Sequence, residues 1–131
     1  MKLVVYLLDT QLVLWLAFEP LRLPARTSRL LADRATPAAF SLVSLWEVAI
    51  KISMGRPDFR LDTRELREGL LNQGFSELGI RAEHLYRVAA LPWVHRDPFD
   101  RLLVAQAMEE GLVLLTADRT LKRYGKAVQV A

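Results

Sequence analysis

Short runs of apolar residues alternate along the chain with longer segments in which apolar residues recur every three or four positions. A short continuous apolar run is typical of a strand that is buried on both faces, and the longer period is typical of a helix. The expected strands are residues 3–8, 38–43, 75–78, 112–115 and, at an edge of the sheet, 127–130.

The segments between these runs carry the residues that begin and end helices. Proline is common in the first turn of a helix, and glycine often follows the last turn. The expected helices are residues 10–18, 24–31, 44–54, 62–73, 81–91, 98–110 and 119–124. Because strands that alternate with helices imply a parallel sheet covered on both faces, we expect a single α/β domain over residues 1–131. Its expected architecture is a three-layer α/β/α sandwich with a central, mostly parallel sheet.

Composition narrows the class of protein. Of the 131 residues 52% are hydrophobic and 25% charged, which is typical of a globular domain. The absence of cysteine excludes disulfides, thiolate zinc sites and a cysteine nucleophile, and it fits a cytoplasmic location. The apolar runs 3–8 and 12–18 are too short for a signal peptide or for the roughly 20 residues of a membrane span. We therefore expect a soluble protein, and its formal charge of +3 is compatible with a polyanionic partner.

Four carboxylates lie where an apolar run gives way to an expected helix. Because the carboxyl ends of parallel strands share one edge of a sheet, where ligands bind, acids spread through the sequence would meet in one cleft. Several carboxylates in one cleft repel each other unless a cation balances them, and their hard oxygen atoms suit Mg²⁺ or Mn²⁺. The predicted ligands are Asp9, Glu47, Asp100 and Asp118.

Helix capping is the alternative reading of each of these acids. Asp9 and Asp118 precede expected helices, and residues 44–47 match a capping box. Asp97 precedes a proline, as an N-cap residue often does. Capping accounts for one acid per helix, however, and does not account for both Asp97 and Asp100. A binding module without catalysis, whose acids serve only as caps, remains the alternative function.

The acids favour metal-dependent phosphodiester hydrolysis, in which two divalent ions activate a water molecule and stabilise the leaving oxygen. That chemistry needs no serine or cysteine nucleophile. A haloacid-dehalogenase-like phosphatase would need a second aspartate at the position of Gln11, and a receiver domain would need paired acids where this chain has Leu8 and Asp9.

Other polar and aromatic residues give weaker signals. Lys51 is four residues after Glu47, so it either forms a surface pair or supplies a cation near the site. His84 is expected to be exposed or half-buried, too far from His95 for a metal pair. The three tryptophans can stack on unpaired bases, but packing in a core or an interface is the expected role of Trp15, Trp46 and Trp93.

Four motifs in order resemble those of PIN-domain ribonucleases, and most closely those of the VapC toxins of toxin–antitoxin pairs. The resemblance extends nearly from end to end of the chain. Each motif alone is weak, whereas the ordered set is specific. The motifs are LLDT at 7–10, SLWEVAIK at 44–51, HRDPFDRLL at 95–103 and TADR at 116–119.

The resemblance implies a PIN-like fold, RNA as the substrate and Mg²⁺, or alternatively Mn²⁺, as the cofactor. It places the family's metal-binding and catalytic carboxylates on the same four acids. Thr116 matches a hydroxyl that supports the site or a metal-bound water. Asp97 is also common in the subfamily and ranks second to Asp100 as a site residue. Gln11 replaces a histidine that close relatives often have, so any role of that imidazole is lost here.

The resemblance also implies protein partners. The segment 11–18 is apolar almost all round, and the helix from Ser44 has a similar excess of apolar residues. A surface helix normally has a single apolar stripe, and extensive exposed apolar patches usually mark an interface. The expected partner is a cognate antitoxin that lays a helix on this surface and silences the nuclease, with the toxin itself forming a homodimer.

Overall fold

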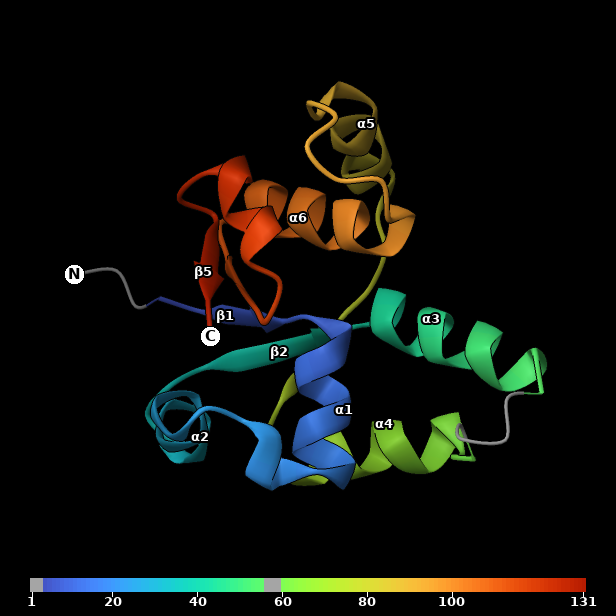
Figure 1. Cartoon of the computed structure of the whole chain (residues 1–131), viewed down its shortest axis with the longest axis vertical. Coiled ribbons are helices and arrows are strands. Elements are labelled where there is room, and N and C mark those ends of the chain that lie inside the picture. Colours follow the sequence, from blue (N-terminus) through green and yellow to red (C-terminus); the bar gives the residue numbers. More distant parts are fainter. Residues whose placement is uncertain (1–3, 56–59) are drawn as a thin grey trace.

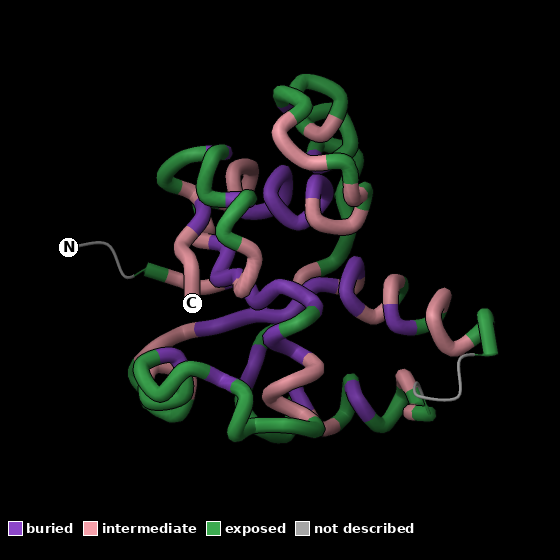
Figure 2. The backbone as a smooth tube through the Cα atoms, in the orientation of Figure 1, coloured by how far each residue is buried: buried purple, intermediate pink, exposed green. Residues whose placement is uncertain are grey.

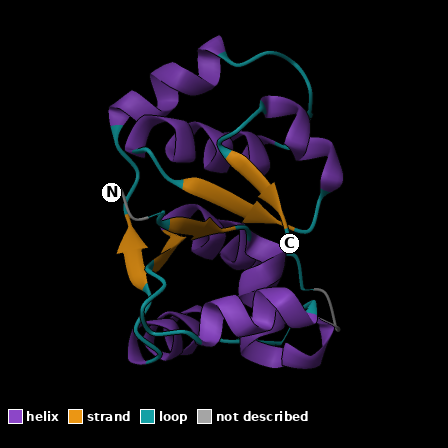
Figure 3. Ribbon diagram, turned by 90° about the vertical axis from the view of Figure 1, so that its left-hand side faces the viewer, coloured by secondary structure: helices purple, strands orange, loops and turns teal. Residues whose placement is uncertain are grey.

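A five-stranded sheet forms the centre of the molecule in the computed structural model, which describes residues 4–55 and 60–131. All strand pairs are parallel, and their order in the sheet is β3-β2-β1-β4-β5. The first strand is central, and the chain crosses to either side of it (Figures 1 and 3). The strands are β1 (Tyr6–Leu8), β2 (Ala38–Ser41), β3 (Ser76–Leu78), β4 (Val113–Thr116) and β5 (Val128–Val130).

Helices cover both faces of this sheet, which confirms the predicted α/β sandwich. In Figure 1, α5 and α6 lie on one side of the strands and α1, α2 and α4 on the other. Helix α3 extends from the carboxyl end of β2. The α-helices are α1 (Thr10–Phe18), α2 (Ala25–Ala32), α3 (Leu42–Ser53), α4 (Thr63–Asn72), α5 (Ala82–Ala90) and α6 (Pro98–Glu110), and the 3₁₀ helices are η1 (Pro20–Arg22) and η2 (Arg119–Tyr124).

Successive residues of the central strands point to opposite faces of the sheet, and each face has its own core. Leu7 and Leu114 pack in the core beneath α6, whereas Leu8 and Leu115 pack with α1 and α4. The strands are therefore buried on both sides, as the short apolar runs predicted (Figure 2). Among the helices that the structure describes, none has the length and apolar character needed to cross a membrane.

Three sequence-based predictions of local structure differ from the structure. The third helix begins at Leu42 and not at Ser44, because Ser41 is the N-cap and its hydroxyl accepts a hydrogen bond from the amide of Val43 at 3.0 Å. Residues 44–47 therefore do not form a capping box. His84 is fully buried instead of exposed or half-buried, because α6 packs over it. The predicted first strand also shortens to Tyr6–Leu8, and Leu3 lies outside the described residues.

Candidate metal centre

Asp9 lies directly after the central strand, and it is both a helix cap and a buried acid. Its Oδ1 accepts a hydrogen bond from the amide of Leu12 at 2.8 Å, as an N-cap does. Its Oδ2 accepts from the hydroxyl of Thr116 at 2.5 Å and from the amide of Ala117 at 3.2 Å. With only 4% of its surface exposed, Asp9 joins the carboxyl ends of β1 and β4 at the sheet edge.

Asp97 and Asp100 both lie at the start of α6, but they have different contacts. Asp97 is the N-cap, because its Oδ1 accepts hydrogen bonds from the amides of Phe99 at 2.8 Å and Asp100 at 3.0 Å. Asp100 is one turn further on, and its side chain lines the same pocket as Asp9. Asp100 therefore lines this pocket, whereas Asp97 caps the helix and is absent from the lining.

Glu47 reaches the site from the middle of α3, where it caps nothing. Its Oε2 lies 3.2 Å from Nζ of Lys51, one turn further along the helix. Its Oε1 is buried and has no hydrogen-bond partner. A buried carboxylate oxygen without a donor is rare in proteins, and an ion or a water molecule is a common explanation.

Asp118 begins η2 and completes the set of acids. Its Oδ1 accepts a hydrogen bond from the amide of Thr120 at 2.9 Å, and its own amide donates to the hydroxyl of Thr116 at 3.0 Å. Its Oδ2 lies 2.9 Å from Nε2 of His95. Thr116 therefore contacts two of the acids, Asp9 and Asp118, and fixes their relative position.

All four predicted carboxylates line one pocket of about 370 Å³ at the carboxyl edge of the sheet. Lys51 and Trp15 line it as well, and the indole nitrogen of Trp15 is buried without a hydrogen-bond partner. The complete lining is Asp9, Thr10, Gln11, Leu14, Trp15, Glu47, Lys51, Asp100, Ala117 and Asp118.

The electrostatics of this pocket disfavour a fully ionised, metal-free state. Burial raises the pKa of Asp9, although hydrogen bonds from Thr116 and from backbone amides partly offset this effect. Burial, and then the charges of Asp97, Asp9 and Glu47, raise the pKa of Asp100 to about 7. The pKa of Asp118 is lowered: burial raises it, but hydrogen bonds from Thr120 and His95 outweigh that effect. A bound cation would favour the charged form of all these acids.

The side chains fit a hard divalent cation. The four acids provide oxygen ligands, and one Glu47 oxygen is buried without a hydrogen-bond partner. Burial first, and then the negative charges of Asp97, Asp9 and Glu47, raise the pKa of Asp100. Mg²⁺ binds through a few carboxylates and keeps several water molecules. The four acids that line the pocket therefore offer enough oxygen ligands for one ion.

His95 is the residue near this site that sequence reasoning missed. Its Nε2 lies 2.9 Å from Asp118 and 3.8 Å from Oδ2 of Asp100. A ligand atom from each of these three residues lies within 4.8 Å of the others. His95 is the first residue of the motif at 95–103, but nothing in the sequence indicated that its ring would meet Asp118.

The remaining candidates lie around or away from the pocket. His84 is buried against Glu110, with Nε2 2.8 Å from Oε2, and does not line the acidic pocket. Trp46 is 52% exposed and packs edge-on against Phe99, and Trp93 is 79% exposed. Neither tryptophan is part of the core of the chain.

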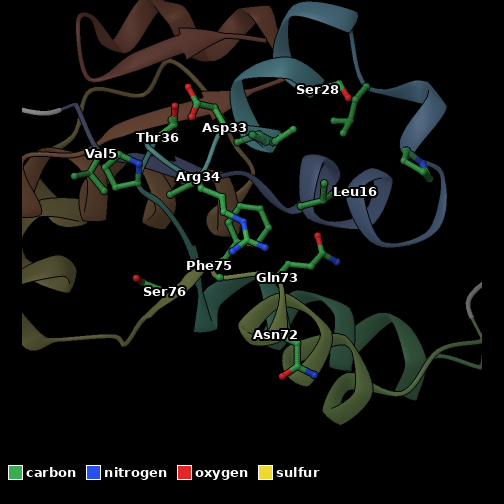
Figure 4. A pocket seen from close by; sticks show the side chains of 17 residues that line it. Val5, Leu16, Ser28, Asp33, Arg34, Thr36, Asn72, Gln73, Phe75 and Ser76 are labelled. Atoms are coloured by element: carbon green, nitrogen blue, oxygen red, sulfur yellow. The ribbon is translucent and has the colours of Figure 1, made fainter.

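A larger cavity of about 900 Å³ lies at the opposite, amino-terminal ends of β2 and β3. Side chains from the segment before β2 and from the turn after α4 surround it (Figure 4). Among the described residues that line it, Asp33 and Arg34 carry the charges. This cavity lacks a group of converging acids, so the chemistry of the smaller pocket defines the site.

Comparison with known proteins agrees with this architecture. Residues 6–127 match the PIN domain family. No curated protein matches the chain in sequence.

Solved structures with the same fold include several toxin–antitoxin complexes. VapBC2 of Rickettsia felis bound to a promoter DNA fragment has a TM-score of 0.71 and 17% identity, over 97% of this chain and 98% of that one. A toxin–antitoxin complex of Klebsiella pneumoniae has a TM-score of 0.63 and 21% identity, over 95% of both chains. DNA-bound VapBC of Salmonella typhimurium has a TM-score of 0.66 and 15% identity, over 98% of both.

The match over residues 6–127 covers nearly the whole chain, and it includes the strands and loops that carry the four acids. The structure independently provides the sheet, the order of its strands and the acidic pocket at its carboxyl edge. This chain therefore belongs to the PIN domain family.

Proposed function

We propose that this chain is a Mg²⁺-dependent or Mn²⁺-dependent endoribonuclease that acts in the cytoplasm as the toxin of a VapC-type toxin–antitoxin pair. The observation that carries the proposal is the convergence of four carboxylates, from four separate segments, on one pocket. Helix capping does not account for it, because Glu47 lies in mid-helix and Asp100 is not the cap of α6.

In this proposal Asp9, Glu47, Asp100 and Asp118 hold the ion or ions. When bound, the ions supply an activated water and stabilise the leaving oxygen of a phosphodiester. Lys51 lies 3.2 Å from Glu47, where it limits the rotamers of that acid. Thr116 holds Asp9 through a hydrogen bond from its hydroxyl.

RNA as the substrate rests on the likeness of the four motifs to VapC toxins and fits the charge of +3. Exposed arginines lie next to site residues in the sequence: Arg96 follows His95, and Arg119 follows Asp118. Arginines in such positions contact phosphates, which position a nucleic acid without reading its sequence.

Replacement of Asp9 by asparagine tests this function by removing the charge of one acid while retaining the helix cap. Asparagine is as good an N-cap as aspartate, so the hydrogen bond from the amide of Leu12 is retained while the charge is lost. Its NH₂ group replaces Oδ2, so it can donate to the hydroxyl of Thr116 but loses the hydrogen bond from the amide of Ala117. We expect Asp9→Asn to fold, as judged by circular dichroism, and to cleave RNA at least 100-fold more slowly than the wild type. A folded variant with wild-type cleavage would refute the proposal. A wild-type chain that binds RNA without cleaving it would favour the non-catalytic module instead.

The antitoxin partner is proposed from exposed apolar side chains of α1 and α3 and of the residue that follows α3. Phe18 is 54% exposed, Trp46 52% and Met54 67%, and exposed apolar patches usually mark interfaces. The solved structures of similar fold include toxin–antitoxin complexes. We expect a homodimer that binds the product of the neighbouring gene, measured by light scattering. A stable monomer that ignores that product would refute this part of the proposal.

A further inference from the structure

Both ring nitrogens of His95 have a hydrogen-bond partner, and the two partners fix its tautomer. Nδ1 lies 3.1 Å from the backbone nitrogen of Asp97, and Nε2 lies 2.9 Å from Oδ2 of Asp118. A backbone amide can only donate, so Nδ1 must accept. The proton of the neutral ring is therefore on Nε2, from which it donates to the carboxylate of Asp118.

Hydrogen bonds also hold the backbone at His95 in place. Its amide donates to the hydroxyl of Tyr124 at 3.2 Å, and that hydroxyl donates to the carbonyl of Pro92 at 3.2 Å. The buried guanidinium of Arg101 also donates to Tyr124, at 3.1 Å. The hydrogen bonds of Tyr124 thus fix the backbone that carries the imidazole. The imidazole itself links the loop before α6 to the loop after β4 through its contact with Asp118.

The short distances to Asp118 and Asp100 invite a second reading, in which His95 is itself a metal ligand. A metal on Nε2 would require the proton of the neutral ring to move to Nδ1. Nδ1–H would then face the N–H of Asp97, and two donors in contact repel each other. The hydrogen bond to Asp97 therefore favours a ring that orients Asp118 over a ring that binds the ion.

We infer that His95 is a positioning residue that holds the carboxylate of Asp118 in the orientation required for metal binding. The inference rests on the proposed metal centre. Asp118 is fixed from two sides, by the amide of Thr120 on Oδ1 and by His95 on Oδ2. Without the imidazole only one of these restraints on the side chain remains. Partners that orient a metal ligand typically contribute 10-fold to 100-fold to metal affinity.

Mn²⁺ binding to the metal-free full-length chain, measured by electron paramagnetic resonance without RNA, tests the inference. We expect His95→Ala to weaken binding about tenfold. His95→Gln should retain most of the affinity, because its amide NH₂ can replace Nε2–H as the donor to Asp118. Asp118→Asn is the matched control that removes the ligand itself.

The outcomes separate the inference from the proposed function. Absence of Mn²⁺ binding by the wild type would refute the proposed metal centre. Binding by the wild type and equally tight binding by His95→Ala would refute the positioning role alone. Equal losses in His95→Gln and His95→Ala would also contradict it, because the donor would then not be what matters.

Two spectra of the wild-type protein test the same point without any variant. Long-range ¹H–¹⁵N correlation NMR should show the Nε2–H tautomer of His95, both without metal and with Mg²⁺ present. Electron spin-echo modulation of bound Mn²⁺ should show no directly coordinated imidazole nitrogen. An Nδ1–H tautomer, or a coordinated imidazole, would overturn the inference in favour of the metal-ligand reading.

Discussion

Asp100→Asn should stabilise the metal-free protein, although it removes a residue of the proposed active site. The side chain of Asp100 is only 22% exposed. Burial and three neighbouring acids raise its pKa from 3.8 to about 7. The folded chain therefore resists ionisation of this carboxyl, and an uncharged asparagine avoids that penalty.

The size of the effect follows from the pKa. Each pKa unit corresponds to about 1.4 kcal/mol, so the difference between 3.8 and about 7 sets an upper limit of roughly 4 kcal/mol. Solvent screening at this partly exposed side chain reduces the expected gain to about 1–2 kcal/mol. For a chain of this length such a gain raises Tm by about 3–8 °C.

The raised pKa of Asp100 also predicts how the stability of the wild type changes with pH. The unfolded carboxyl ionises near pH 4 and the folded one near pH 7. Between these values the folded state binds more protons, so the wild type loses stability as the pH rises. The advantage of Asp100→Asn should therefore be small at pH 4.5 and complete at pH 8.

Thermal denaturation in EDTA, followed by circular dichroism at these two pH values, measures this advantage. Asp118→Asn is the matched control of opposite sign, because hydrogen bonds from Thr120 and His95 lower the pKa of Asp118 and stabilise its charge. It should lower Tm at pH 8. The reasoning fails if Asp100→Asn is no more stable than the wild type at pH 8, or if the gain is the same at both values.

Three further predictions concern neighbouring residues and pH. Asp97→Asn should retain most activity and stability, because asparagine also caps a helix, whereas Asp97→Ala should lower the free energy of unfolding in urea by about 1 kcal/mol. An inactive Asp97→Asn together with a nearly wild-type Asp100→Asn would reverse the ranking of these two residues. Thr116→Val should weaken Mn²⁺ binding severalfold in calorimetry, because the hydroxyl that orients Asp9 is lost; an unchanged Kd would exclude this role. The Mn²⁺ affinity of the wild type should increase as the pH rises through about 7, because Asp100 then loses its proton. An affinity that stays constant from pH 6 to 8 would contradict the raised pKa.

Local signals in the sequence predicted most of the fold. The first helix has the predicted bounds, residues 10–18, and Asp97 with Pro98 begins α6 as expected. Both follow from capping and proline geometry, which depend only on neighbouring residues. Asp9, Asp100 and Asp118 lie at such signals, near the end of a strand or the start of a helix, whereas Glu47 lies in the middle of α3.

Predictions failed where contacts between distant segments decide the structure. Residues 44–47 match the capping box, yet Ser41 caps the helix and Ser44 accepts a hydrogen bond from the hydroxyl of Thr10 at 3.0 Å. His84 is buried by its contact with Glu110, 26 residues further along the chain. His95 meets Asp118 across 23 residues. The residues next to each histidine in the sequence do not indicate which distant carboxylate it will contact.

Cleavage of RNA by the purified chain, with metal removed and then restored, tests the central claim most directly. The claim is that the pocket lined by Asp9, Glu47, Asp100 and Asp118 is a divalent metal centre that cuts phosphodiesters. We predict that excess EDTA abolishes cleavage and that Mg²⁺ or Mn²⁺ beyond the chelator restores it. Full activity in excess EDTA would contradict the claim.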